Sequence, residues 1–146
     1  KYTFLEELIN FSEYNLHCYN SNSIIKICDL LDIKTKIISK DLSNVILEND
    51  IKNQNDIEKE LIKYERVLRL SKKYEATSYT NPIGGVELYK KDYFKKNDVD
   101  LFFLQTNDFS YKQFGNSFTP YLSIIDQLMH VGVNETKKII KEYKLI

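Results

Sequence analysis

The sequence is poor in the residues that build several common kinds of functional site. Its two cysteines, Cys18 and Cys28, are too few for a disulfide framework, and they lack the close Cys/His pairs of a structural zinc site. We expect both to be reduced thiols packed on helices of a cytoplasmic protein. The two histidines, His17 and His130, show no recognisable relay with an acid or a cysteine. No catalytic triad and no metal site is therefore predicted.

Charge of one sign and long apolar runs are also missing. The 21 Lys plus Arg balance the 21 Asp plus Glu, so the formal net charge is zero and charge alone will not hold nucleic acid or an anionic membrane. No apolar run approaches the ~18–20 residues of a membrane span, and no N-terminal apolar region precedes a cleavage site. We therefore expect neither nucleic acid binding nor a membrane span.

What remains is a composition typical of a globular domain. The chain has 146 residues, of which 42% are hydrophobic and 29% charged, and this length favours a single domain over residues 1–146. Apolar spacing predicts helices over residues 2–14, from Asn20 or Ser21 through Leu31, over 56–74, 86–96 and 120–131, and after Asn134. Strands are predicted over residues 33–39, 76–80 and 99–105, with a loop at 43–55.

This alternation implies an α/β fold with a mainly parallel sheet flanked by helices. Three strands make a thin sheet, so either further strands lie in a segment missing from this chain or the count is low. The chain begins at Lys1 rather than Met, which favours a fragment or a processed product. Thr119 and Pro120 are placed to begin the helix that Gly132 ends.

The first candidate site follows the second predicted strand. Asn81, Gly84 and Gly85 lie in the loop Asn81-Pro82-Ile83-Gly84-Gly85 before a predicted helix. Ligands of α/β sheets bind at the carboxyl ends of strands, and paired glycines expose N–H groups that bind phosphate or carboxylate. The alternative is a tight turn in which one glycine needs positive φ.

The second candidate follows the third predicted strand. Tyr111, Gln113, Phe114 and Asn116 lie in an irregular segment where aromatic rings can stack on a sugar or base and amides can bind hydroxyls. Alternatively, Tyr111 and Phe114 only anchor the loop to the core. Both interpretations remain open on the sequence.

Two further places carry polar groups of interest. Ser123 and Asp126 lie three residues apart near a helix N-terminus, among apolar neighbours, where a carboxylate needs a partner. A structural Asp that binds a backbone N–H or a Lys is the alternative. Arg66 is one of only two arginines, and it suits bidentate binding of a carboxylate or phosphate, although a surface pair with a nearby acid explains it too.

Taken in order, these motifs resemble the WbqC-like protein family. The string that carries the resemblance comprises Glu65-Arg66, Tyr79 to Gly85 with Leu88-Tyr89, the strand at 99–105, Tyr111-Lys112-Gln113-Phe114, Phe118 to Asp126, and Gly132. The resemblance implies a bacterial, cytoplasmic enzyme of O-antigen or other lipopolysaccharide biosynthesis. Members are commonly described as glycine or aminoacyl transferases that act on amino sugars.

One departure from the family concerns the start of the chain. Members normally begin with a strand and a segment of the Gln-Pro-Tyr-Phe-Pro-Tyr kind, and this sequence has nothing like it. We therefore expect residues 1–146 to be the larger C-terminal portion of a WbqC-like protein. If the absent segment carries catalytic groups, this portion binds a ligand without turning it over.

The resemblance also implies roles for the candidate residues toward a nucleotide-linked amino sugar. Asn81, Gly84 and Gly85 bind a phosphate or carboxylate, Tyr111 and Gln113 line the sugar side, Ser123 and Asp126 face the same cleft, and Arg66 and Tyr89 bind substrate. Asp126 would take the proton of the attacking amine, and amides near Gly84 would stabilise the oxyanion.

Two other functions remain as alternatives. One is a nucleotidyl transferase on a related fold, recognised by pyrophosphate release. The other is a non-catalytic module that scaffolds a polysaccharide pathway, recognised by partner binding without a small molecule. The sequence indicates no cofactor, acyl donor or oligomeric state.

Overall fold

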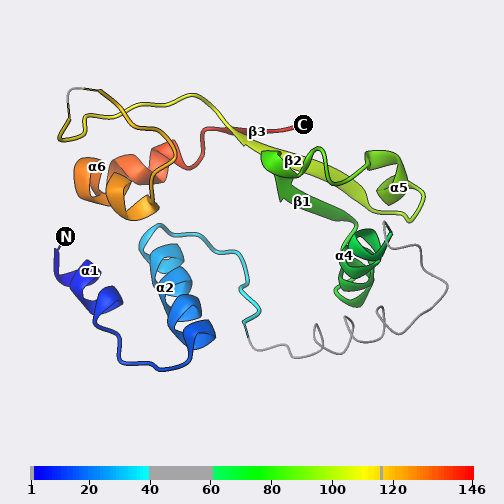
Figure 1. Cartoon of the computed structure of the whole chain (residues 1–146), viewed down its shortest axis with the longest axis horizontal. Coiled ribbons are helices and arrows are strands. Elements are labelled where there is room, and N and C mark those ends of the chain that lie inside the picture. Colours follow the sequence, from blue (N-terminus) through cyan, green and yellow to red (C-terminus); the bar gives the residue numbers. More distant parts are fainter. Residues whose placement is uncertain (1, 40–60, 116) are drawn as a thin grey trace. The chain divides into compact units, whose positions relative to one another are not determined.

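The computed structural model of the chain describes residues 2–39, 61–115 and 117–146 (Figure 1). Its contacts divide these residues into two compact units. The first contains the described residues of Lys1–Ser39 and Asn107–Glu142, and the second those of Lys40–Thr106 and Tyr143–Ile146. The loop predicted at 43–55, the start of the helix predicted from Asp56, and Asn116 lie outside the described residues. The single domain stays a prediction.

The first unit contains three helices: α1 (Tyr2–Ile9), α2 (Leu16–Leu30) and α6 (Ile124–Ile139). The helix predicted over 2–14 is therefore shorter. The predicted caps at Asn20 and Ser21 are wrong, because the Asn15 side chain accepts a hydrogen bond from Cys18 N at 3.2 Å and begins α2 five residues earlier. Residues 33–39 form no strand, since their β-branched side chains find no strand to pair with.

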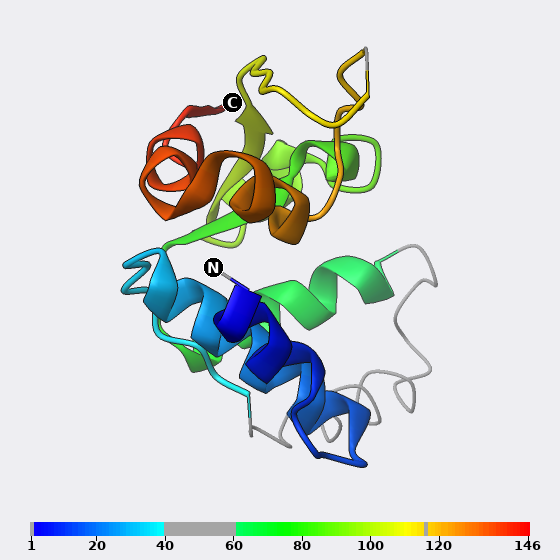
Figure 2. The ribbon, with the colours of Figure 1, turned by 90° about the vertical axis from the view of Figure 1, so that its left-hand side faces the viewer.

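The helix α6 begins later than its sequence signals suggest. Thr119 and Pro120 do not start it, because Tyr121 has a left-handed φ of 60° and the chain cannot continue as a helix through it. Ser123 is the N-cap instead, and its hydroxyl accepts a hydrogen bond from Ile125 N at 3.2 Å. Gly132, with φ 79° and ψ 175°, interrupts the helix as predicted, but the helix resumes at once. Figure 2 shows the resulting change of direction in the orange-to-red coil.

The second unit is built on a small mixed sheet. Its helices are α4 (Ile62–Lys73), the 3-10 turn η1 (Ile83–Gly85) and α5 (Lys91–Lys95), and its strands are β1 (Ser78–Pro82), β2 (Asp100–Thr106) and β3 (Tyr143–Leu145). β1 runs parallel to β2, with Thr80 opposite Phe102, whereas β2 and β3 are antiparallel, with Gln105 opposite Lys144. The α/β class is confirmed, but the predicted mainly parallel sheet is wrong, because β3 forms where a helix through Tyr143 was expected.

The core of the second unit lies where α4 and α5 pack on β2. Leu101 and Phe103 are buried and alternate with the half-buried Phe102 and Leu104, so one face of this strand is covered more completely than the other. The buried cluster also contains Tyr64, Leu68, Phe94 and Val99. The helix expected over 86–96 is confined to α5, since η1 and its following turn occupy the preceding residues.

Candidate functional site

In the first unit, the loop before α6 folds back so that its polar side chains meet the helix. The Tyr111 hydroxyl donates to Asp126 Oδ2 at 2.7 Å, and Gln113 Nε2 donates to the same oxygen at 3.1 Å. Gln113 is itself fixed by Thr119, whose N–H donates to Gln113 Oε1 at 2.8 Å and whose carbonyl accepts from Nε2 at 3.1 Å. Three residues predicted as site residues are therefore brought together.

A fourth residue of this group is His130, which the sequence analysis did not connect to an acid. Its Nε2 lies 3.5 Å from Asp126 Oδ1, one helical turn away. The side chains of His130 and Asp126 are 10% and 26% exposed. The four-residue spacing of Asp126 and His130 within one predicted helix is the feature of the sequence that could have predicted this pair. His130 was predicted at a helix C-terminus, and it does lie two residues before the break at Gly132.

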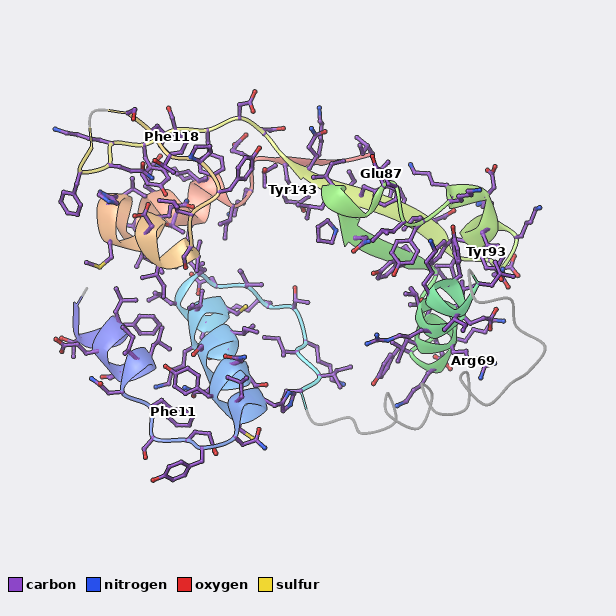
Figure 3. All side chains as sticks on the ribbon, viewed as in Figure 1. Phe11, Arg69, Glu87, Tyr93, Phe118 and Tyr143 are labelled. Atoms are coloured by element: carbon purple, nitrogen blue, oxygen red, sulfur yellow. The ribbon has the colours of Figure 1, made fainter. Side chains whose placement is uncertain are left out.

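Aromatic rings surround this polar group. Tyr111 stacks on Phe109 at a centroid distance of 6.2 Å, and Phe118 meets Tyr111 edge to face at 5.1 Å. Figure 3 shows Phe118 on the segment that runs along α6. Phe114 approaches the His130 ring at 4.6 Å yet is 98% exposed. Tyr111 therefore fits the alternative role of anchoring the loop to the core, whereas the exposed Phe114 fits it less well.

The hydrogen bonds of the group fix the Asp126 carboxyl group in place. Partial burial raises the pKa of Tyr111, and its hydrogen bond to Asp126 raises it further, so the phenol stays protonated and keeps donating. Gln113 donates to the same oxygen, and His130 Nε2 lies 3.5 Å from the other, so the carboxylate is contacted on both sides. A carboxylate in this position can orient an imidazole, as in acid–base pairs.

Ser123 has a different position from the one predicted. It is the N-cap of α6, where its hydroxyl accepts from Ile125 N and its carbonyl accepts from Asp126 N at 2.9 Å. It therefore holds the first turn in which Asp126 lies. A catalytic role for Ser123 stays a prediction.

In the second unit, positive φ does not explain the glycines of the turn after β1. Among the described residues, the glycine with positive φ is Gly132, and neither Gly84 nor Gly85 adopts this conformation. A Cβ on Gly85 would lie 2.0 Å from Asn81 Nδ2, whereas a Cβ on Gly84 would meet nothing within 4 Å. Asn81 and Gly85 are thus in close contact. The turn leads into a three-residue 3-10 helix rather than a long helix, and its anion-binding role stays a prediction.

Arg66 and Tyr89 line an open pocket of about 450 Å³ in the same unit, together with Tyr79. The neighbouring Glu65 is held from two sides, by Arg69 Nε at 3.4 Å and by the Tyr93 hydroxyl at 3.4 Å. Figure 3 labels Arg69 on α4 and Tyr93 on α5. The predicted site residues are thus divided between the units. Tyr111, Gln113 and Asp126 meet in the first unit, whereas in the second unit Arg66 and Tyr89 line a pocket whose lining does not include the glycine turn. The shared cleft stays a prediction.

Over residues 2–39, 61–115 and 117–146, no group of three or more His, Cys, Asp and Glu side chains is arranged to hold a metal ion. Within the same part of the chain, no helix has both the length and the apolar character needed to cross a membrane.

The profile of the WbqC-like protein family matches residues 1–138. No curated protein and no solved structure matches the chain.

Proposed function

The chain belongs to the WbqC-like protein family, and from this premise we propose that it transfers a glycyl or other aminoacyl group to the amine of a nucleotide-linked amino sugar. The proposal places the reaction in the cytoplasm of a bacterium, in the synthesis of O-antigen or a similar surface polysaccharide. The observation that carries it is the contact of Asp126 with Tyr111, Gln113 and His130 in the first unit.

The chemistry needs a group that removes one proton. The neutral amine of the sugar attacks the carbonyl carbon of an activated glycyl donor, and a C–N bond forms. The bond between that carbon and the leaving group of the donor, a phosphate oxygen or a sulfur, then breaks, and its electron pair leaves with that group. The proton released by the nitrogen goes to the Asp126–His130 pair. No other co-reactant is required for this step.

The surrounding residues support this assignment. Tyr111 and Gln113, for which the family resemblance implies a place on the sugar side, fix the Asp126 carboxylate through Oδ2 and leave Oδ1 facing His130. Asp126 then keeps the imidazole of His130 in place. The exposed ring of Phe114, which lies beside His130, is available to stack on the sugar.

The test compares rates of glycyl transfer for the wild-type chain and matched variants. Asp126→Asn and His130→Gln are each expected to lower the rate by about 100-fold or more, the usual contribution of acid–base catalysis. Asp108→Asn is the matched control, because Asp108 is an exposed carboxylate on the same loop. Each variant is first checked for folding by circular dichroism and thermal unfolding.

The outcomes separate the competing functions. Full turnover by Asp126→Asn would remove the assignment of the proton to this pair. Release of pyrophosphate from a nucleoside triphosphate, without aminoacyl product, would favour a nucleotidyl transferase. Binding of a protein partner with no small-molecule turnover would favour a scaffold.

A further inference from the structure

The pocket of the second unit combines a positive charge with three phenols and an aliphatic wall. Its polar lining includes Arg66 and the tyrosines Tyr74, Tyr79 and Tyr89, and its apolar lining is formed by Val67, Leu70 and Ala76. Its volume of about 450 Å³ falls in the range of pockets that bind small molecules, roughly 300–1,000 Å³. The pocket therefore has the size and the mixed lining of a ligand site.

Two of the three phenols of the pocket, Tyr79 and Tyr89, are held in place by the core. The Tyr79 ring stacks on Phe94 at 5.8 Å with an interplanar angle of 13°, and Tyr89 meets Phe94 edge to face at 5.7 Å. Phe94 is fully buried. Tyr79 and Tyr89 also contact each other edge to face at 6.1 Å. Because their rings are fixed, their hydroxyls are positioned before any ligand arrives, which lowers the entropic cost of binding.

The charge of Arg66 acts on the Tyr79 hydroxyl. Burial raises the pKa of Tyr79 and the neighbouring Tyr89 raises it further, while Arg66 acts in the opposite direction. The guanidinium is therefore close enough to influence the Tyr79 hydroxyl. A guanidinium beside two phenolic O–H groups provides charge-assisted and neutral donors for the oxygens of one phosphate group.

We infer that this pocket binds a nucleoside diphosphate, with the phosphates toward Arg66 and the nucleoside along the wall of Val67, Leu70 and Ala76. The inference rests on the proposed function in one respect: the nucleotide-linked sugar is taken as the source of the nucleoside diphosphate. A free nucleoside diphosphate has the same recognition chemistry. The predicted phosphate loop at Gly84 and Gly85 is not among the residues that line the pocket.

The experiment measures binding to the full chain by isothermal titration calorimetry. The probes are UDP, GDP, ADP and dTDP, with uridine and inorganic pyrophosphate as the two halves of the ligand and UDP-N-acetylglucosamine as a nucleotide-linked sugar. At least one diphosphate is expected to bind more tightly than either half alone. Arg66→Gln should weaken that binding about tenfold or more, as expected for hydrogen bonds to a charged group, and Arg66→Lys should weaken it less.

The matched control is Arg69→Gln. Arg69 is the other arginine of α4 and pairs with Glu65, but it does not line the pocket. Its loss should leave the affinity for the diphosphate within about twofold, well under the ~1.4 kcal/mol that a tenfold change represents. Tyr89→Phe, which keeps the ring and removes one donor, should weaken binding without altering thermal unfolding greatly.

Several results would overturn the inference. They are absence of binding by every diphosphate at millimolar concentration, equal weakening by Arg66→Gln and Arg69→Gln, or binding of uridine as tight as that of UDP. Tighter binding of UDP-N-acetylglucosamine than of UDP would identify the linked sugar as the source. Diphosphate binding that depends on Arg66, in a chain without transferase activity, would support this inference while the proposed function fails. Transfer whose rate is unchanged by Arg66→Gln would support the proposed function and contradict this inference.

Discussion

The partly buried carboxylate of Asp126 is contacted by side chains of the preceding loop and of α6. Moving a carboxylate out of water has a cost unless donors replace the lost solvent. Tyr111 and Gln113 supply these donors at Oδ2, and His130 lies beside Oδ1. The same contacts that stabilise the loop on α6 thus fix the group proposed to handle the proton.

Removing one donor from Asp126 should have a measurable effect on stability. Tyr111→Phe keeps the ring contacts with Phe118 and loses the 2.7 Å hydrogen bond. We expect it to lower the free energy of unfolding by about 1–2 kcal/mol, because the acceptor is charged. Urea denaturation measures the change.

The matched control for this prediction is Tyr121→Phe. Tyr121 is 92% exposed, so loss of its hydroxyl should change stability by no more than about 0.5 kcal/mol. Equal effects of the two substitutions would contradict the assigned role of the Tyr111 hydroxyl.

The two glycines of the turn after β1 should differ in their tolerance of a methyl group. Gly85→Ala places a Cβ 2.0 Å from Asn81 Nδ2, so Asn81 must move, and we expect a loss of about 1–3 kcal/mol. Gly84→Ala has open space and should be neutral or stabilising by up to about 1 kcal/mol. Thermal unfolding of both variants provides the comparison.

A double substitution tests the cause of this difference. In the background of Asn81→Ala, the atoms that crowd position 85 are gone, so Gly85→Ala should cost clearly less than it does alone. The same cost in both backgrounds would show that crowding by Asn81 is not the reason for glycine.

At the scale of elements, α6 consists of two helical parts joined at Gly132. Its φ of 79° and ψ of 175° belong to a region of backbone conformation that is essentially restricted to glycine. The buried hydroxyl of Thr136, which lies in the second helical part, donates a hydrogen bond to Gly132 O at 2.8 Å and so stabilises the break. The break places the end of the first part just after His130.

Replacing this glycine should therefore destabilise the first unit. Gly132→Ala forces an L residue into the strained region at an expected cost of about 1–3 kcal/mol. It should also shift the histidine C–H resonances of His130 in the nuclear magnetic resonance spectrum. Unchanged stability, with the variant as tolerant as Gly84→Ala, would contradict the requirement for glycine at this break.

Local signals in the sequence predicted some of these elements and missed others for physical reasons. α4, β1, β2 and the interruption at Gly132 follow from periodicity and from residue type at one place in the chain. β3 was missed because its three residues, Tyr143–Leu145, are extended only through pairing with β2, and pairing between distant segments leaves no local pattern. The strand predicted at 33–39 failed for the converse reason, a local pattern without a partner.

The same contrast holds for the candidate site. Tyr111, Gln113 and Asp126 were recognisable as polar or aromatic groups in unusual places, and the structure brings them together. The i, i+4 relation of Asp126 to His130 was present in the sequence and was not used. The contact of Asn81 with Gly85 and the pocket beside Arg66 depend on how the chain folds in three dimensions.

At the scale of the whole molecule, the tyrosines determine how stability responds to alkaline pH. Burial is the main cause that raises the pKa values of Tyr79, Tyr93 and Tyr111 above 10.0. The folded state therefore keeps these phenols protonated at pH values where the unfolded chain has released their protons. Stability due to this effect is complete below pH 10.0 and is lost as pH rises through the folded-state values.

We therefore expect the free energy of unfolding to fall steeply above about pH 10. Urea denaturation at a series of pH values measures the slope. Tyr93→Phe, which removes the phenol next to Glu65, should make the slope shallower, whereas Tyr121→Phe should leave it unchanged. A stability that is constant through this range would contradict the assignment.

The most direct measurement of the central claim is the mass of the product. The chain is incubated with an activated glycyl donor and either a nucleotide-linked amino sugar or the matching nucleotide-linked sugar with a hydroxyl in place of the amine. We expect mass spectrometry to show the mass of one added glycine residue on an amino sugar, only when the protein is present. No such product with any nucleotide-linked amino sugar and activated donor, or equal modification of the hydroxyl sugar, would contradict aminoacyl transfer by this chain.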